Sequence, residues 1–367
     1  MVNIDAWSVS EHEFPHEGST QDKLVFCIRY ALLAPSIYNT QPWQFEVKGA
    51  ECRLYADRRY ALAVIDPDDR SLIIACSAAL FNLRMAIRYF GYSEDVSFIP
   101  DVENEDLLAT VKFGEKIESE NDEDRDQDIF KVVTAFEKNH GAFLNKAVSQ
   151  EDIDDFKTAC SAEGAWLYVC DQNEKNRVIN MVAEADRIQS MTKNFRRELC
   201  LWTDKRRVES NDGMPNYGME FSAMMNQFLP HILRRFAGPD KEAVTDSGFA
   251  ENVPLLAILG TVSGGAVERM MTGQALMRLC LLAQSKGLSI STLNQVCEVP
   301  EMRLRLHDEI NQQGRAHIIL RLGYGGKIKH TARRPLESVL KVNGIPYVVP
   351  PSEKAKVGSK RKFWPFK

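Results

Sequence analysis

The stretch Ala34-Pro35-Ser36-Ile37-Tyr38-Asn39-Thr40-Gln41-Pro42-Trp43-Gln44-Phe45 joins a helix-like run to an alternating run that is typical of a strand. Pro35 and Pro42 each fix their own φ and also restrain the residue in front of them. The segment between the two prolines is therefore predicted to be a stiff, extended loop.

The loop presents a hydroxyl (Ser36), two carboxamides (Asn39 and Gln41) and a flat aromatic ring (Trp43). Such a set can bind a planar ligand with polar edges at little cost in ordering entropy. Polar loops bounded by prolines are also common as simple connections between elements. The residues alone leave both interpretations open.

Composition limits the classes of protein to consider. The chain has 367 residues, 44% hydrophobic and 26% charged, which are ordinary globular proportions and suggest two domains or one large α/β unit. A net charge of −5 argues against a general nucleic-acid surface. The eight cysteines are dispersed without a Cys-x-x-Cys pair or a ligand-like Cys/His spacing, so we expect a reducing cytoplasm and no metal site.

Targeting signals are not evident in the sequence. The first fourteen residues contain no lysine or arginine, unlike a secretory signal. We also expect no membrane span, since no apolar run approaches the roughly 20 residues that are needed.

Capping signals and charge divide the chain. Ser19-x-x-Asp22 resembles a capping box, and Asp66-Pro67-Asp68-Asp69 opens a long apolar helix that Gly91 ends. These aspartates are better explained by a helix N-terminus than by a metal site. The acidic run from Glu115 to Asp128 lacks the pattern of a calcium loop and is predicted to be a solvated linker. The predicted units are a tail (1–18), a first half (19–114), the linker (115–128), a second half (129–345) and a second tail (346–367).

The second half reads as alternating helices and strands. Helices are predicted at 129–139, at 174–207, where charges suggest a solvated face, and at 273–286. Strands are predicted at 166–170, 255–259 and 316–322. The glycines at 323–326 are read as a turn, because no helix follows to make a phosphate loop.

The opening loop resembles the flavin-binding loop of the nitroreductase family, whose pattern is Ala-Pro-Ser, a few residues, then Asn-x-Gln-Pro-Trp. The segments 272–288 and 322–337 resemble the late helix and the C-terminal basic segment of that family. The segments 66–72 and 77–86 resemble its Acg-like branch, in which one chain holds two nitroreductase-like halves. The resemblance implies an α+β fold in which two tandem halves form an internal pseudo-dimer, each a mainly antiparallel sheet flanked by helices.

The resemblance also implies an FMN site at the seam between the halves. Its first-half members would be Pro35, Ser36, Asn39 and Gln41. Arg333 and Arg334 would bind the flavin phosphate, although a pair of surface arginines is the alternative. Asn294 and Gln295 lie where the backbone of the family approaches flavin N5.

One segment departs from the family pattern. The family has a motif resembling Arg-x-Thr-Asn-Arg-Gly-Pro-Phe, where this chain reads Phe136-Glu137-Lys138-Asn139-His140-Gly141-Ala142-Phe143. Phe136 and His140 replace the two arginines, while Lys138 can restore phosphate charge and Asn139 keeps the motif's asparagine. A histidine at position 140 can titrate near neutral pH. The flavin site is therefore either retuned or weakened.

Three functions remain open on this basis. The first is an FMN-dependent oxidoreductase that takes hydride from NADH or NADPH and passes it to a small nitroaromatic or quinone-like acceptor, with no essential side-chain acid or base. The second is an FMN-sequestering protein whose segment 208–235 covers the flavin and which turns over little. The third is a scaffold that has lost FMN. We expect one flavin per chain, in a monomer or a homodimer.

Overall fold

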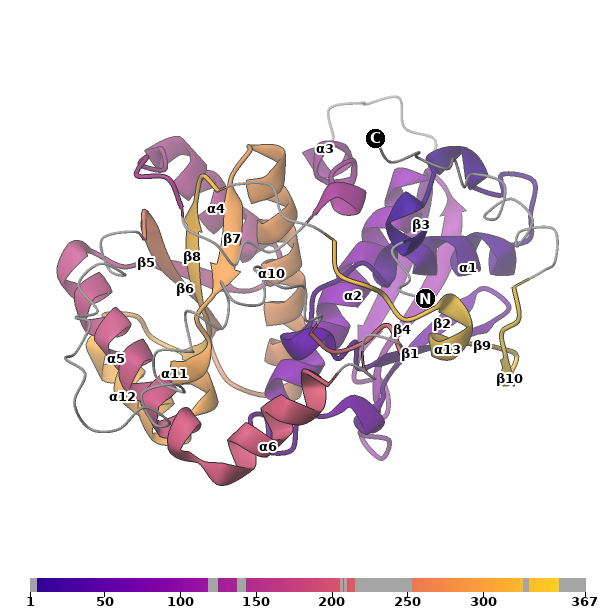
Figure 1. The fold of residues 1–367 in the computed structure, drawn as a ribbon. Helices are drawn as coiled ribbons and strands as arrows, with labels where there is room; N and C mark the ends of the chain where they lie inside the picture. Colours follow the sequence, from indigo (N-terminus) through magenta and orange to yellow (C-terminus); the bar gives the residue numbers. More distant parts are fainter. Residues whose placement is uncertain are drawn as a thin grey trace, which may run out of the picture.

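The computed structural model describes residues 5–117, 125–136, 143–204, 207, 210–214, 253–325 and 330–349, except for the side chain of residue 125. These residues form two units side by side, each built on one sheet and one long central helix (Figure 1). The expected α+β class is confirmed.

The first sheet has the strand order β10-β9-β1-β2-β4-β3 and the second the order β5-β6-β8-β7. The strands are β1 (Trp43–Lys48), β2 (Glu51–Ala56), β3 (Tyr92–Phe98), β4 (Leu107–Lys116), β5 (Trp166–Val169), β6 (Leu255–Thr261), β7 (Ser289–Thr292), β8 (Arg315–Gly323), β9 (Leu340–Val342) and β10 (Ile345–Pro346).

Helices cover both sheets. They are α1 (Thr20–Ala31), α2 (Arg70–Tyr89), α3 (Arg125–Phe130), α4 (Gln150–Ala162), α5 (Gln172–Met191), α6 (Lys193–Trp202), α10 (Ala266–Ser285), α11 (Gln295–Glu298), α12 (Pro300–Glu309) and α13 (Leu336–Val339). Short 3₁₀ turns lie at Asp5–Ser8, Glu11–Glu13, Ile37–Asn39, Arg58–Tyr60 and Val133–Ala135.

Helix α2 begins as the sequence predicts. The carboxylate of Asp66 accepts hydrogen bonds from the backbone N–H groups of Ser71 and Leu72, both at 2.9 Å. These bonds satisfy donors that the first turn of a helix leaves free. Gly91 follows the helix with a φ of 83°. By length and composition α2 is apolar enough to cross a membrane, but 94% of that stretch is buried inside the protein, as in a core helix.

The two central helices, α2 and α10, meet backbone to backbone. A Cβ atom at Gly273 of α10 would lie 2.3 Å from the carbonyl oxygen of Ile74 and 2.6 Å from the Cβ of Ser77. The Ser77 hydroxyl donates a hydrogen bond to the carbonyl of Met270. Only glycine allows this close crossing.

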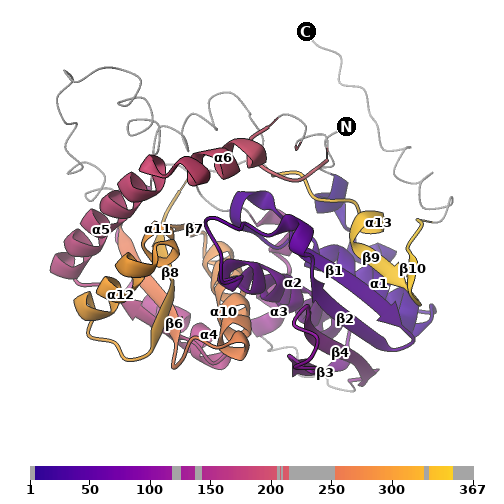
Figure 2. The same ribbon diagram turned by 90° about the horizontal axis from the view of Figure 1, so that it is seen from below.

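The two sheets repeat one connectivity. In each, the first two strands (β1 and β2, or β5 and β6) are antiparallel, and the long central helix comes after them in the chain. The last two strands form a second antiparallel pair. The later strand of that pair (β4 or β8) lies beside β2 or β6, and the earlier one (β3 or β7) lies at the edge of the sheet. The first sheet receives an addition from the C-terminal end of the chain. Strand β9 pairs in parallel with β1, with Leu340 opposite Phe45 and Val342 opposite Val47 (Figure 2).

Three expected boundaries differ from the structure. The helix predicted at 129–139 is α3, which ends at Phe130 and is followed by a 3₁₀ turn. The helix predicted at 174–207 is broken at Thr192, whose backbone is extended (φ −78°, ψ 118°), so that α6 leaves α5 at an angle (Figure 2). Within the predicted solvated linker, Asp126 belongs to α3 and pairs with Arg278, and both side chains are largely buried.

Candidate functional site

The loop between α1 and β1 is strained rather than extended, so that part of the sequence prediction is wrong. Tyr38, Asn39 and Gln41 have φ values of 50°, 54° and 51°. Residues with a side chain rarely adopt this left-handed conformation, and each instance costs about 1–3 kcal/mol. Strain of this kind persists only where surrounding contacts fix it, and it concentrates at functional sites.

The polar side chains of the loop hold it to two distant segments. The Asn39 side-chain amide donates to the carbonyl of Gly213 at 3.2 Å and to that of Ala332 at 3.0 Å. The Gln41 side-chain amide donates to the carbonyl of Asn211 at 2.9 Å. Ser36 remains within the loop, where its hydroxyl accepts from the Gln41 backbone N–H at 2.9 Å. The two carboxamides therefore bond to protein.

Arg333 is buried against this loop, with 4% of its surface exposed. Its guanidinium donates to the side-chain oxygen of Asn39 and to the carbonyl of Leu33, both at 3.1 Å. The guanidinium carbon lies 4.6 Å from the centre of the Trp7 ring.

Arg334 is also buried, with 2% exposed. It makes two hydrogen bonds to Gln41, one from its backbone N–H and one from its guanidinium. The interpretation of Arg333 and Arg334 as surface arginines is therefore wrong. Segment 331–339 runs from β8 back to the first sheet, which is how both arginines reach the loop (Figure 1).

The two remaining loop residues have no polar role in the structure. Pro35 is half-buried and lies two residues after the turn that follows α1. Trp43 is the first residue of β1 and is fully buried in the core, so its ring is not presented to a ligand.

Asn294 and Gln295 lie in the second half, where Asn294 is the N-cap of α11 and Gln295 its first residue. The side-chain oxygen of Asn294 accepts from the backbone N–H of Ile319 at 3.3 Å. Gln295 is 7% exposed, and its side-chain oxygen has no hydrogen-bond partner within the described part of the chain. A buried acceptor without a partner is rare in folded proteins. Among the described residues, no hydrogen bond links this pair to the loop.

The departing segment is described in part. Lys138, Asn139 and His140 lie outside the described residues. Phe136, which replaces the first arginine of the family motif, is buried in the main core with 3% exposed. The aromatic ring at this position thus contributes to packing.

A group of buried and half-buried acids (Tyr38, Glu198 and Glu298) lies beside the loop, and sequence reasoning missed it. Burial raises the pKa of Tyr38 well above its usual value, and the carboxylates of Glu298 and Glu198 raise it further. Burial also raises the pKa of Glu298 to about 7, although the Gln189 amide, which donates to it at 2.8 Å, opposes that rise.

Glu198 shows why these acids were missed. It belongs to a charge run that was read as a solvated helix face, yet it is 9% exposed. Its carboxylate accepts from the backbone N–H groups of Val64 and Ile65, each at 3.0 Å. The apolar residues around it, among them Trp202, are the signal that one face of α6 is buried.

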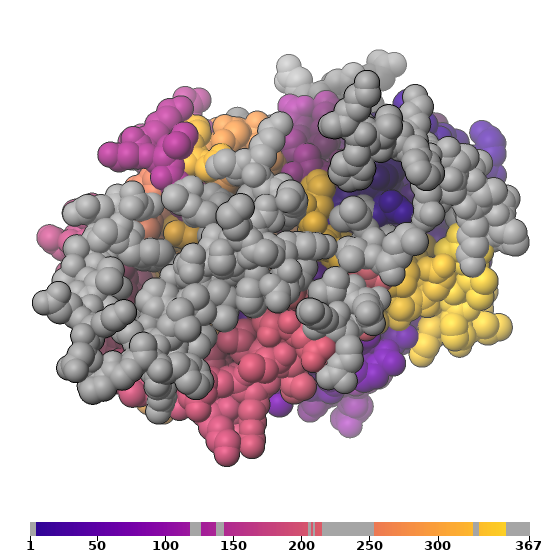
Figure 3. All heavy atoms as spheres, in the orientation of Figure 1, coloured from indigo at the N-terminus to yellow at the C-terminus, as the bar shows by residue number. Residues whose placement is uncertain are grey.

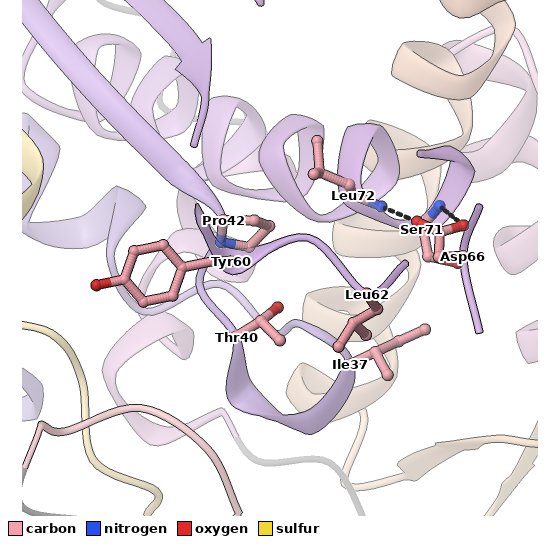
Figure 4. Close-up of a pocket in the computed structure, with 8 residues that line it drawn as sticks. All are labelled: Ile37, Thr40, Pro42, Tyr60, Leu62, Asp66, Ser71 and Leu72. Atoms are coloured by element: carbon pink, nitrogen blue, oxygen red, sulfur yellow. Dashed lines mark hydrogen bonds between the residues drawn. The ribbon is translucent and has the colours of Figure 1, made fainter. Parts of the chain in front are cut away.

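A small cavity lies under the loop (Figure 4). Its empty volume, which includes open solvent at its mouth, is about 210 Å³. The hydroxyl of Ser71, which lines it, has no partner within the described residues. Its lining is Ile37, Thr40, Pro42, Tyr60, Leu62, Asp66, Ser71 and Leu72.

The donor set fits a flavin in part. The buried acceptor of Gln295 suits an N–H group at the edge of a planar ligand, whereas the Asn39 and Gln41 carboxamides are bonded to protein. Arg333 and Arg334 do not offer their charge to a phosphate in this arrangement, because both side chains are buried and bonded to the loop. The residues therefore fit the flavin ring better than they fit its phosphate.

Comparisons with known proteins point to one family. No family model matches the chain. It is 25% identical over 332 residues to the "Putative NAD(P)H nitroreductase Rv3131" of Mycobacterium tuberculosis, covering 89% of this chain and 92% of that protein. It is 20% identical over 344 residues to the "Putative NAD(P)H nitroreductase acg" of the same species, covering 89% and 98%.

Solved structures give a weaker likeness. A nitroreductase from Bacteroides fragilis with bound FMN is 14% identical, with a TM-score of 0.33 over 56% of this chain and 93% of that one. A nitroreductase-like structure from Anabaena variabilis is 9% identical, with a TM-score of 0.39 over 80% and 82%. Likeness of this size fixes neither fold nor function.

The sequence relatives align over nearly the whole of both chains, and the strained loop carries every anchoring residue of the family's flavin-loop pattern. The chain is thus similar over most of its length to mycobacterial proteins named putative NAD(P)H nitroreductases.

Proposed function

We propose that the protein is an FMN-dependent oxidoreductase that takes hydride from NADH or NADPH and reduces a small electron-poor acceptor of the nitroaromatic or quinone type. The observation that carries the proposal is the strained loop, whose residues match the flavin-loop pattern at every anchor. The names of the mycobacterial relatives support it. When bound, a flavin supplies the hydride chemistry, and the protein binds and orients it.

The residues proposed for the flavin site come from three parts of the chain. The first half contributes Pro35, Ser36, Asn39 and Gln41, and the segment after β7 contributes Asn294 and Gln295. Because Gln295 has a buried side-chain oxygen without a partner among the described residues, an N–H group of the flavin ring would relieve a real deficit. Lys138, Asn139 and His140 complete the proposed set on resemblance alone.

The proposed architecture is an internal pseudo-dimer of two halves. Its support is the shared strand order of the two sheets and the contact of α2 with α10 at Ser77 and Gly273. The long loop precedes only the first sheet, since α4 is joined to β5 by residues 163–165. We therefore propose one flavin per chain, in a monomer or a homodimer.

We also propose that the protein works in a reducing compartment, such as the cytoplasm. Buried free thiols occur at Cys27, Cys52, Cys76, Cys160 and Cys297. Unpaired thiols are typical of a reducing environment such as the cytoplasm.

The test is the visible absorbance of the purified protein after reconstitution with FMN. The proposal expects one FMN per chain and rapid bleaching of its absorbance by NADH or NADPH without oxygen, with recovery on addition of a quinone. A protein that takes up no FMN would refute the proposal. Two flavins per chain would refute only the single-site part.

A second candidate function is an FMN store with little turnover. The observation that favours it is the turn at 211–214, which bonds to Asn39 and Gln41 and thus covers the side chains of the loop. A store would hold FMN tightly yet be bleached slowly by either nicotinamide. The rate of bleaching therefore separates the two functions.

A further inference from the structure

The guanidinium of Arg334 is fixed by hydrogen bonds and by an aromatic ring. It donates to the carbonyl of Gln41 at 2.8 Å and to the carbonyl of Ser338 at 3.1 Å. One face of the guanidinium lies over the Tyr60 ring, with 3.9 Å between the guanidinium carbon and the ring centre. The planar fork of arginine suits such paired contacts, and a lysine would not reproduce them.

Gln41 is the main partner of Arg334 and is fully buried. Its backbone carbonyl accepts from the guanidinium, and its side-chain oxygen accepts from the Arg334 backbone N–H at 2.7 Å. Arg334 thus bonds both the backbone and the side chain of Gln41, whose φ is 51°. Contacts of this kind can offset the cost of a left-handed conformation.

Arg334 lies beside two buried carboxylates that also pair with other arginines: Arg59 donates to Asp57 at 2.7 Å and Arg207 to Asp212 at 3.2 Å. The carboxylate of Asp57, only 5% exposed, lies 3.6 Å from the guanidinium. Asp212, 3% exposed, is a second carboxylate close enough to act on Arg334 electrostatically. A phosphate dianion at this guanidinium would have to displace its hydrogen bonds to the carbonyls of Gln41 and Ser338, in a buried site that already contains two carboxylates.

We infer that Arg334 is a positioning residue, which holds Gln41 and the strained loop in the shape that receives the flavin, and that it does not bind the flavin phosphate. The inference rests on the proposed flavin function, and it departs from the role that family resemblance assigns to this arginine.

The test compares FMN with riboflavin, which differs from FMN only by lacking the phosphate. Dissociation constants for both ligands are measured by fluorescence titration on the wild type, Arg334→Ala and Arg334→Lys. The matched control is Arg197→Ala, because Arg197 is exposed on α6. We expect Arg334→Ala to weaken both flavins by about tenfold or more and to leave their affinity ratio within about twofold of the wild-type ratio.

Arg334→Lys separates charge from geometry, and it also serves if the alanine variant does not fold. A positioning role predicts that lysine weakens both flavins equally, because it keeps the charge but loses the fork. A phosphate ligand would behave differently. In that case the alanine variant would lose affinity for FMN alone and lysine would restore most of it, and this result would overturn the inference.

Hydrogen exchange tests the same role without a flavin. In the flavin-free wild type, the backbone N–H groups of Asn39, Thr40 and Gln41 are bonded within the loop and should be protected. Arg334→Ala should speed their exchange while the amides of α10 keep their protection. Equal protection in both proteins would refute the positioning role. A wild type that binds neither flavin would refute the proposed function, and the exchange result would still decide the role of Arg334.

Discussion

The connections that lead into the first strand of each sheet are very different, although the two sheets share a strand order. Helix α1 reaches β1 through residues 32–42, with three left-handed residues that carry side chains. Helix α4 reaches β5 through residues 163–165, where glycine, Gly164, takes the left-handed conformation (φ 78°). The framework can therefore be built with a short, relaxed turn. The fold therefore does not require the length and strain of the first connection. Features of this kind are typical of loops that bind a ligand.

The largest loss of stability is expected from a substitution at the contact between α2 and α10, because both units depend on that contact. Gly273→Val should destabilise the protein by at least about 4 kcal/mol, since its Cβ would overlap the backbone of α2. Urea unfolding measures the loss. Gly264→Ala is the control, because its Cβ would meet only an ordinary contact at 3.6 Å, and it should be neutral. A mild Gly273→Val variant would contradict the close crossing.

The second effect is a change of stability with pH that comes from Glu298, one of the acids beside the loop. Glu298 has its pKa raised from 4.5 to about 7 by burial. Below pH 4.5 the carboxyl group is protonated in both the folded and the unfolded chain. Between pH 4.5 and about 7 the unfolded chain loses a proton that the folded chain retains, so stability falls by up to about 3 kcal/mol and then stays level.

Glu298→Gln is the matched variant, since it keeps the shape of the side chain without its titration. It should flatten the stability profile between pH 4.5 and 7, measured by urea unfolding at fixed ionic strength. A wild-type stability that rises across this window in parallel with the variant would show that Glu298 is ionised in the folded protein.

The smallest effect separates strain from bonding in the loop. Asn39→Gly loses the side-chain hydrogen bonds but tolerates a φ of 54°, whereas Asn39→Ala loses the bonds and adds strain. We expect Asn39→Ala to be less stable than Asn39→Gly by about 1 kcal/mol, and both variants to bind FMN more weakly than the wild type.

The control for this pair lies in the short connection. Gly164→Ala introduces strain of the same kind and a close contact with Met271, so it should cost a similar free energy of unfolding. It should leave FMN binding unchanged. Loss of FMN binding in Gly164→Ala would remove the contrast between the two connections.

Local signals were predictable from the sequence. Ser19 and Asp22 form the expected capping box, and α2 ends before Gly91 as expected, because both features depend on neighbours a few residues away. The position of the loop was likewise evident from its prolines.

The conformation of the loop was not predictable. Its left-handed residues are held by partners at 211–213 and 332–334, and no local pattern encodes such contacts. The burial of Arg333 and Arg334 was missed for the same reason, as was the pairing of β9 with β1. The charge run concealed the break at Thr192, after which Glu198 of α6 accepts from the backbone N–H of Ile65.

The parallel pairing of β9 with β1 sets the order in which the protein can be completed during translation. Phe45 leaves the ribosome early, but Leu340, its partner across the sheet, is made about 300 residues later. At roughly 5–20 residues per second, the edge of β1 waits about 15–60 s for its neighbour. The segment that brings the strand also brings Arg334, so the loop acquires its final shape only after this distant segment has been made.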